Sequence, residues 1–403
     1  MNKLPDNWKE VKLGDIVDII MGQSPKSQFY NKRNEGMPFL QGSSTFGLLY
    51  PTFEVYSSNI KKIAVNGSVL MSVRAPVGDL NIANADICIG RGLCSINGKN
   101  KYLNRYIYYL LNYYKPQLMN MQKGTTFGAI TKDDILNFEV LITEDAEEQK
   151  RIASALSKVD AYLENTIKLT ESKERFKRAI TKKLLTCKEN KNVPEARFEG
   201  FKDEWKKYNL SKIGISYGGL KNKKAKSFLE NCNAKYITYK SIYDKSKIDI
   251  DRLENVFVDK NENQNLVKYG DAFFTISSET PNELAMSSIL LDEVENTYLN
   301  SFCFGFRFDF NILLPKFARY YFRSDYIRKS TYKLAQGSTR YNISKNKFLD
   351  IIIYLPSLEE QEKIGEFLSL LDAEIDNLKK QAESIKRLKK GLMKKLMSGE
   401  IRV

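Results

Sequence analysis

The stretch EEQKRI at residues 147–152 returns as EEQEKI at residues 359–364, and this repeat decides the fold. The correspondence continues without a gap to KKL at residues 182–184, which matches KKL at residues 394–396. Self-similarity of this kind is the signature of a duplicated structural unit. We therefore expect the chain to be one globular-then-helical unit written twice.

Both repeated stretches are predicted to be long helices, because they lack proline and their apolar residues recur at steps of three and four. The first row is Ile152, Leu156, Val159, Leu163, Thr166, Thr170, Phe176, Ile180 and Leu184. The second row is Ile364, Leu368, Leu371, Ile375, Leu378, Ala382, Ile385, Leu388, Leu392 and Leu396. A helix of about 40 residues is roughly 60 Å long and needs a partner. The simplest partner is the other copy, in an antiparallel coiled coil.

Each helix start is predicted to be a capping box. Asp145 stands three residues before Glu148, and Ser357 stands three residues before Glu360. In such a box the first side chain accepts from a free amide of the first turn, and the glutamate reaches back to the cap.

Weaker correspondences run in the same order through the segments before the helices. The first correspondence pairs Trp8, Leu13 and Ile16 with Trp205, Leu210 and Ile213, and the second pairs Gly67 and Leu70 with Gly270 and Phe273. The third pairs Arg105-Tyr106 with Arg319-Tyr320. The fourth pairs GTT at 124–126, followed by Ile130, with GST at 337–339, followed by Ile343. Alternating runs at 68–73, 272–277 and 303–308 predict strands, and 103–114 and 316–332 predict helices. The fold class is mixed α/β with a pseudo-two-fold internal repeat. The expected domains are 1–145 and 204–357, with long helices at 146–187 and 358–403 (including a C-terminal tail) and a linker at 188–203.

The composition favours a polyanionic partner and argues against an enzyme. Lys and Arg number 64 against 49 Asp and Glu, which gives a net charge of +15. An excess of this size would attract nucleic acid, and the alternative is a soluble protein that is simply basic. The chain has no histidine, so histidine general bases and the commonest metal ligand are missing. We find no catalytic constellation, phosphate-binding loop or cofactor motif. Five scattered cysteines without a C-x-x-C pair are expected to be reduced and mostly buried. Without a signal-peptide core or a membrane-length apolar run, we expect a cytoplasmic protein.

Several polar, glycine-bearing loops fit contact with DNA, although ordinary surface turns would have a similar composition. They lie at 22–27, 41–45 and 122–126 in the first half, and at 218–224 and 336–341 in the second. Gln, Asn, Arg and Lys can pair with base edges, and Ser and Thr can bond phosphates. The lysines and arginines near the helix ends fit either nucleic acid or a solvated helix face. The tyrosines at 102–114 could stack on bases, but their helical spacing favours a core position.

The chain resembles the specificity subunits of type I restriction–modification systems over essentially its whole length. The resemblance lies in the duplicated plan, the EEQxxI start of both helices, the WKxxxL start of each half, and the G-[ST]-T loops followed by isoleucine. It includes PEARFEGF at 194–201 and SGEIRV at 398–403.

The resemblance implies two target recognition domains that each read half of a bipartite double-stranded DNA site, with the helices setting the gap. It implies docking of two adenine-N6 methyltransferase subunits and, through them, of restriction/translocase subunits. S-adenosylmethionine, ATP and Mg²⁺ would bind those partners, with no cofactor in this chain. The implied DNA-binding residues are Gln23, Lys26, Thr125, Thr126, Asn222, Lys223, Ser338, Thr339 and Arg340. A coiled-coil scaffold without sequence-specific DNA binding is the alternative hypothesis.

Overall fold

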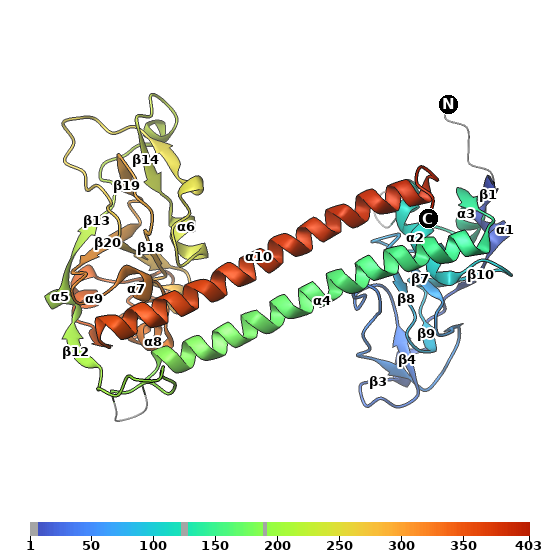
Figure 1. Cartoon of the computed structure of the whole chain (residues 1–403), viewed down its shortest axis with the longest axis horizontal. Coiled ribbons are helices and arrows are strands. Elements are labelled where there is room, and N and C mark those ends of the chain that lie inside the picture. Colours follow the sequence, from blue (N-terminus) through green and yellow to red (C-terminus); the bar gives the residue numbers. More distant parts are fainter. Residues whose placement is uncertain (1–6, 122–127, 188–191) are drawn as a thin grey trace. The chain divides into compact units, whose positions relative to one another are not determined.

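The protein forms two compact units in the computed structural model, which describes residues 7–121, 128–187 and 192–403. Unit 1 comprises residues 1–169 and 378–403, and unit 2 comprises residues 170–377 (Figure 1). The chain therefore passes between the units within α4 (Ala146–Leu185) and within α10 (Leu358–Met397), which are both 40 residues long. Each unit consists of a globular part and portions of both long helices.

Unit 1 is built on a four-stranded antiparallel sheet in the order β2-β10-β7-β8, with helix α2 packed on it. These elements are β2 (Val17–Met21), β7 (Val69–Ser72), β8 (Leu80–Ile82), β10 (Leu93–Gly98) and α2 (Asn104–Asn120). A second sheet has the order β3-β5-β4-β9-β6, and β1 pairs with β11. Their strands are β1 (Trp8–Lys12), β3 (Tyr30–Asn31), β4 (Met37–Leu40), β5 (Tyr56–Ser57), β6 (Ile63–Ala64), β9 (Ile87–Ile89) and β11 (Glu139–Thr143). The short helices are α1 (Leu13–Ile16), η1 (Ser27–Phe29) and α3 (Lys132–Leu136).

Unit 2 repeats this plan with a sheet in the order β13-β20-β16-β18. Its strands are β13 (Gly214–Gly218), β16 (Ala272–Thr275), β18 (Ser287–Ile289) and β20 (Cys303–Phe308). The smaller sheets are β12 (Lys206–Asn209) with β22 (Ile352–Leu355); β15 (Glu254–Val256), β14 (Ala234–Ile237) and β19 (Thr297–Leu299); and β17 (Ser277–Ser278) with β21 (Tyr341–Asn342). The helices are α5 (Leu210–Ile213), η2 (Ala225–Phe228), α6 (Tyr239–Asp244), η3 (Ile250–Arg252), η4 (Pro281–Glu283), α7 (Pro315–Tyr321), α8 (Asp325–Tyr332) and α9 (Lys345–Leu349).

The mixed α/β prediction is confirmed, but one predicted helix is divided. Residues 316–332 form α7 and α8, which are separated at Ser324. The Ser324 hydroxyl caps the second helix by accepting a hydrogen bond from the amide of Ile327. Serine at this position competes with helix continuation because its side chain replaces a backbone partner.

The core of each unit includes the start of one long helix and the end of the other. In unit 1, Ile152 of α4 and Leu396 of α10 join the residues of the sheet and α2 in one buried cluster. In unit 2, Leu184 of α4 and Ile364 of α10 join the corresponding cluster. Burial of these apolar side chains fastens both helices to each globular part.

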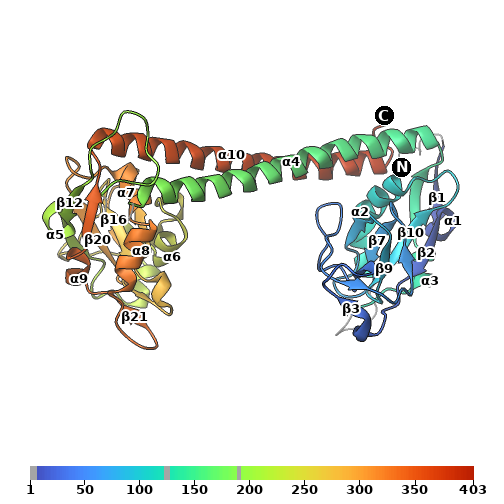
Figure 2. The same ribbon diagram turned by 90° about the horizontal axis from the view of Figure 1, so that it is seen from below.

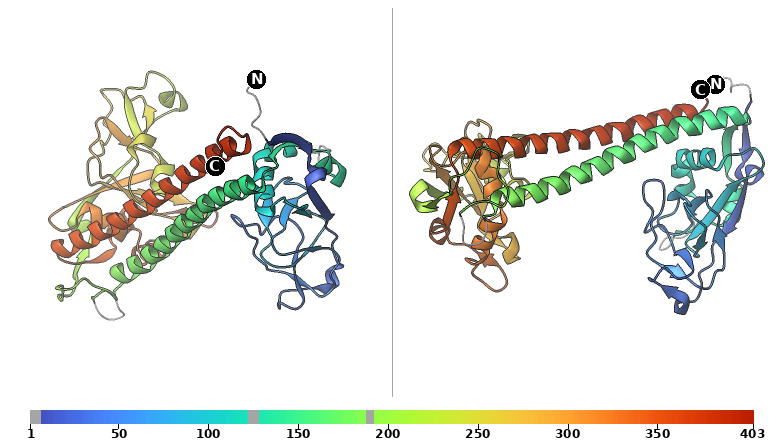
Figure 3. Two further views of the ribbon diagram at one scale, coloured as in Figure 1. Left: turned by 45° about the vertical axis from the view of Figure 1, so that its right-hand side comes forward. Right: turned by 60° about the horizontal axis from the view of Figure 1, so that its bottom comes forward.

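The portions of α4 and α10 within each unit run side by side in opposite directions (Figure 3). In unit 1, Leu163 packs against Ala382 and Ile385. In unit 2, Lys173 forms an ion pair with Glu374 at 2.8 Å. Ion pairs across the helices thus occupy some of the basic residues near the helix ends.

Two residues of the predicted apolar rows are exposed, so their assignment to the buried seam was wrong. Phe176 of α4 is 51% exposed and Leu388 of α10 is 71% exposed. The two residues occupy equivalent positions of the repeat, 212 residues apart. They remain exposed because their helix faces carry no described partner element.

Each helix start is held by an arginine that follows the end of the other long helix. Glu148 accepts from Arg402 Nε at 2.9 Å, and Glu360 accepts from Arg197 Nε at 2.8 Å. Both glutamates are only 1% exposed. Arg197 belongs to the PEARFEGF segment and Arg402 to the SGEIRV segment. These two dissimilar segments therefore each supply the arginine that pairs with the buried glutamate at a helix start.

The capping-box prediction is confirmed for the caps and wrong for the first glutamate. Asp145 Oδ1 accepts from the amide of Glu147 at 2.9 Å, and Ser357 Oγ accepts from the amide of Glu360 at 3.3 Å. The amide of Asp145, however, donates to the Thr143 hydroxyl. Glu148 instead receives hydrogen bonds from Arg402 and Thr143.

One sequence correspondence has to be shifted by three residues. Tyr109 donates to Asp160 and Tyr320 donates to Asp372, both at 2.7 Å. Tyr320 is therefore the counterpart of Tyr109, and not of Tyr106 as the Arg-Tyr pairs suggested. The prediction that the tyrosines at 102–114 are largely core residues is confirmed for Tyr106 and Tyr109, which are buried.

Candidate nucleic-acid interface

In unit 1, two predicted DNA-contact loops meet at the turn between β9 and β10, at one end of the four-stranded sheet. The amide of Gly22 donates to Leu93 O and the amide of Gln23 donates to Ile89 O, both at 2.9 Å. Ser24 Oγ donates to Gln41 Oε1 at 2.8 Å, which ties the loop at 22–27 to the loop at 41–45. These contacts bring segments far apart in sequence onto one surface.

The corresponding end of unit 2 has the same backbone arrangement. Gly219 donates to Cys303 O as Gly22 donates to Leu93 O, and Leu220 donates to Leu299 O as Gln23 donates to Ile89 O. A further match lies where the G-[ST]-T loops end. Ile130 donates to Val73 O, and Ile343 donates to Ile276 O. The isoleucines that follow the two G-[ST]-T loops therefore bind equivalent places, directly after β7 and directly after β16.

A glycine is required where the first of these loops leaves the sheet. A Cβ atom on Gly22 would lie 2.2 Å from Gly90 O, and one on Gly219 would lie 2.0 Å from Asn300 O. Neither distance is tolerated, and the opposing atoms belong to backbone that cannot swing away. The close approach fixes the path by which each loop starts.

The predicted DNA-binding residues of unit 1 are exposed where the structure describes them. Gln23 and Lys26 both lie on the surface of the loop at 22–27. Thr125 and Thr126 lie outside the described residues. In unit 1 the structure thus places Gln23 and Lys26 at the sheet end where the loops converge.

In unit 2, four of the five predicted residues are exposed. Ser338, Thr339 and Arg340 lie in the loop before β21, on the side of unit 2 away from the long helices (Figure 2). Asn222 lies in the loop that starts at Gly219 and has a positive φ of 56°. The end of β13, where this loop begins, lies close to the start of α9, because a Cβ atom on Gly218 would lie 3.6 Å from Lys345 Nζ.

Lys223 differs from the other predicted residues. Its Nζ lies 2.6 Å from Glu262 Oε1, and its side chain is 5% exposed. The hydrogen bond from Lys223 is the largest of the causes that hold the pKa of Glu262 below its ordinary value. The position of Lys223 suits a structural lysine that secures the loop at 218–224 to its neighbour, and it offers no free ammonium group to DNA.

Two exposed arginines of unit 1 were missed by the sequence reasoning. Arg74 follows β7, and Arg91 lies in the turn between β9 and β10. Arg91 is flanked by Gly90 and Gly92 in this turn. The exposure of Arg91 depends on the packing of Gly90 and Gly92 against Gln41, which the sequence does not reveal.

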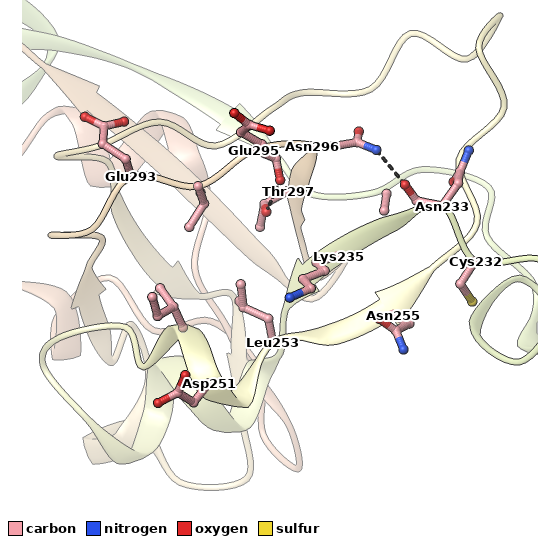
Figure 4. A pocket seen from close by; sticks show the side chains of 13 residues that line it. Cys232, Asn233, Lys235, Asp251, Leu253, Asn255, Glu293, Glu295, Asn296 and Thr297 are labelled. Carbon is pink, nitrogen blue, oxygen red and sulfur yellow. Dashed lines mark hydrogen bonds between the residues drawn. The ribbon is translucent and has the colours of Figure 1, made fainter.

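A groove of unit 2 has the wrong charge for DNA. It lies beside strands β14, β15 and β19 and is lined by the carboxylates Asp251, Glu293 and Glu295, with Lys235 among them (Figure 4). Three carboxylates against one ammonium group would repel a phosphate backbone. The groove therefore does not belong to the candidate interface.

The described residues contain no cluster of His, Cys, Asp or Glu that could hold a metal ion. The five cysteines are free thiols, of which Cys88, Cys94 and Cys303 are buried. Burial raises the pKa of Cys94 to about 12, so its thiol is protonated at neutral pH. Within the same ranges, no helix combines the length and the apolar character needed to span a membrane.

Comparison with known proteins identifies the repeated unit. The sequence pattern of the type I restriction modification DNA specificity domain matches the chain twice, over residues 5–171 and 202–387. The chain belongs to this family. Each of its specificity domains carries one of the two loop-bearing sheet ends described above.

Relatives and solved structures agree with this membership. The putative type I restriction enzyme MjaX specificity subunit of Methanocaldococcus jannaschii is 42% identical over 191 residues, which cover 47% of this chain and 45% of that protein. The MjaVIII specificity subunit of the same organism is 24% identical over 100% of this chain and 94% of that protein. The crystal structure of a type I restriction–modification S subunit from M. genitalium has the same fold, with a TM-score of 0.61, 18% identity and 98% coverage of both chains.

Proposed function

We propose that this chain is the DNA-binding specificity subunit of a type I restriction–modification complex and that each unit reads one half of a bipartite target. The observation that carries the proposal is the recurrence of one loop-bearing sheet end in both specificity domains, with different side chains on it. Gln23 and Lys26 project from unit 1, and Ser338, Thr339 and Arg340 project from unit 2. Two equivalent sheet ends that carry different exposed side chains suit the recognition of two different half-sequences.

The residues proposed to read DNA are the exposed members of the predicted set together with Thr125 and Thr126, which lie outside the described residues. Gln23, Asn222 and Arg340 have side chains that pair with base edges, whereas Lys26 and the hydroxyls of Ser338 and Thr339 suit phosphates or bases. The net charge of +15 supplies the sequence-independent attraction. We assign recognition to this chain and the chemistry to its partners.

We further propose that α4 and α10 set the gap between the half-sequences. The division between the units falls within these two helices, at residues 169–170 and 377–378. A continuous helix has a fixed rise of about 1.5 Å per residue, so its length is a stable measure of distance.

The methyltransferase partners are proposed to dock at two equivalent places on the long helices. Phe176 and Leu388 are large, exposed apolar residues at matching positions of the repeat. A single exposed apolar side chain is common on protein surfaces, so the docking proposal rests on the recurrence of Phe176 and Leu388 at matching positions. Two matching sites fit two copies of one adenine-N6 methyltransferase subunit, which would bring S-adenosylmethionine. Restriction/translocase subunits with ATP and Mg²⁺ would join through them, in the cytoplasm.

Genome-wide mapping of methyladenine with and without the gene for this chain tests the function and identifies the target. The expected result is loss of methylation at one bipartite sequence. A chain that only bridges proteins would leave the methylation pattern unchanged. It would also show no salt-dependent retardation of duplex DNA when bound to its methyltransferase.

The docking sites are tested by Phe176→Glu and Leu388→Glu, separately and together. Each single variant is expected to bind one methyltransferase subunit fewer, as measured by the mass of the purified complex, and the double variant two fewer. Leu169→Glu is the control, because Leu169 is also exposed on α4 but its counterpart in the repeat is Gln381. Full assembly of the double variant would contradict docking at these places.

A further inference from the structure

The turn between β9 and β10 of unit 1 presents an arginine from a closed backbone frame. The amide of Leu93 donates to Gly90 O at 3.0 Å, which closes a β-turn with Arg91 and Gly92 at its corners. Because β10 runs on into the centre of the four-stranded sheet, the turn is anchored to the core of the unit.

Packing against Gln41 fixes this turn. A Cβ atom on Gly92 would lie 2.5 Å from Gln41 O, and one on Gly90 would lie 2.7 Å from Gln41 Oε1. The amide of Arg91 donates to Ser24 Oγ at 3.1 Å, and Ser24 donates in turn to the Gln41 side chain. The backbone of Arg91 is therefore held in place before any ligand arrives, which lowers the entropy lost on binding.

The guanidinium of Arg91 is available for a ligand. The side chain is exposed, and within the described part of the chain it forms no hydrogen bond or ion pair. Arg74 lies beside the turn, since the amide of Val73 donates to Gly92 O at 2.9 Å, and the Arg74 side chain is likewise exposed. Two exposed arginines therefore extend from neighbouring backbone at the end of the sheet that also carries the loop of Gln23 and Lys26.

The equivalent turn of unit 2 has a different character. The amide of Cys303 donates to Asn300 O, and Ile276 donates to Phe302 O as Val73 donates to Gly92 O. The corners of this turn are Ser301 and Phe302, and Phe302 is 59% exposed. One frame thus carries a cation in unit 1 and an apolar ring in unit 2.

We propose that Arg91 reads a guanine in the half-sequence bound by unit 1. An arginine on a fixed turn can donate both hydrogen bonds of its fork to O6 and N7 of guanine in the major groove, and this is the commonest specific contact between protein and DNA. The inference rests on the proposed function, and it adds a residue and the base that this residue selects. The counterpart of Arg91 in unit 2 is Ser301, which has no guanidinium group to make this contact.

The test is a selection from duplex DNA with a randomised sequence, retained by the complete complex of this chain with its methyltransferase subunits. The wild-type complex is expected to enrich a bipartite motif with an invariant G·C pair in one half. In the Arg91→Ala complex, the preference at that single pair is expected to fall by about 10- to 100-fold. The other half, read by unit 2, should be unchanged and reports that the variant is folded.

Lys101→Ala is the charge-matched control, because Lys101 lies beyond the opposite end of β10 and is exposed. It is expected to leave the motif unchanged. If Arg91→Ala enriches the wild-type motif with undiminished preference, the proposal is overturned. Weaker retention of all sequences with the same motif would make Arg91 a phosphate contact and equally overturn the reading of guanine. If the wild-type complex enriches no motif, the proposed function itself fails, which is a separate result.

Discussion

Gly22 and Gly219 show how a single missing side chain can position a loop of the candidate interface. Each lies against a carbonyl oxygen of the turn that precedes the central strand, Gly90 O or Asn300 O. Because the opposing atoms are backbone, a methyl group could be accommodated only by displacing the turn or the loop. The requirement is therefore geometric and does not depend on what the loop binds.

Gly22→Ala is expected to disturb recognition of one half-sequence while destabilising unit 1 by about 1–3 kcal/mol, as overpacking usually does. The measurements are urea unfolding and methyladenine mapping. Gly42→Ala is the matched control, since a Cβ atom there would have no neighbour within 4 Å. Equal effects of the two substitutions would show that close packing at Gly22 is unimportant.

Glu148 couples the stability of unit 1 to pH. Burial alone would raise its pKa, but hydrogen bonds from Arg402 and Thr143 outweigh burial and hold the pKa below the ordinary value of 4.5. A carboxyl group whose pKa is lower in the folded state stabilises that state above the ordinary pKa. This contribution is lost as the pH falls below 4.5 through the folded-state pKa.

In Arg402→Met, the hydrogen bonds from Arg402 that lower the pKa of Glu148 are lost, whereas the effect of burial remains. The pKa of Glu148 should therefore rise, and unit 1 should become more sensitive to acid. We expect the acid unfolding midpoint of unit 1, followed by tryptophan fluorescence from Trp8, to move to higher pH. Trp205 in unit 2 is replaced by phenylalanine in both proteins so that the signal reports unit 1 alone. An unchanged midpoint would mean that Arg402 does not control the ionisation of Glu148.

At the scale of the elements, the ends of the long helices are the points where helix and globular part are joined. The pair of Arg197 with Glu360 is the more buried of the two joints, with side chains 13% and 1% exposed. Removing one partner leaves a buried charge without its counterion, which costs far more than the net strength of the pair.

Arg197→Met is expected to destabilise unit 2 by about 3–5 kcal/mol in urea unfolding. Arg252→Met in the same unit should cost less than about 1 kcal/mol, because its pair with Asp244 is exposed. A loss of similar size in both variants would argue against a special role for the helix start.

The long helices could be predicted closely. Their apolar rows repeat over many turns, so the predicted start at 146 and the observed start of α4 at Ala146 coincide. The strand predicted at 303–308 likewise coincides with β20. Strands of two residues, such as β3 and β17, carry too little periodicity to be detected. Phe176 and Leu388 were misplaced because a periodic row shows which side chains share a face, and not whether that face is covered.

The loops at 22–27 and 41–45 were predicted from glycine and polar composition, but the hydrogen bond from Ser24 to Gln41 that joins them could not be predicted in this way. Composition could not show that Lys223 is buried against Glu262, because the ion pair joins residues 39 positions apart. It could not single out Arg91 either, since its exposure depends on the packing of Gly90 and Gly92 against Gln41. Contacts between distant segments decide both cases.

At the scale of the whole molecule, the proposed spacer role of α4 and α10 predicts a change in target geometry. Inserting one heptad into each helix, at facing positions, preserves the apolar row and adds about 10 Å of helix. The accepted gap should lengthen by roughly three base pairs at 3.4 Å per pair, with both half-sequences unchanged. Methyladenine mapping gives the gap directly, and an unaltered gap would exclude the helices as its determinant.

The division of the chain between the units also orders its folding during synthesis. Unit 2 is a single continuous segment, so the ribosome delivers all of it before residue 378 is made. Unit 1 has to wait for residues 378–403, because Leu396 fills its core and Arg402 neutralises its buried Glu148. The domain translated first is thus the one completed last, and until then its open core and the unpaired carboxylate of Glu148 are exposed to chaperones and proteases.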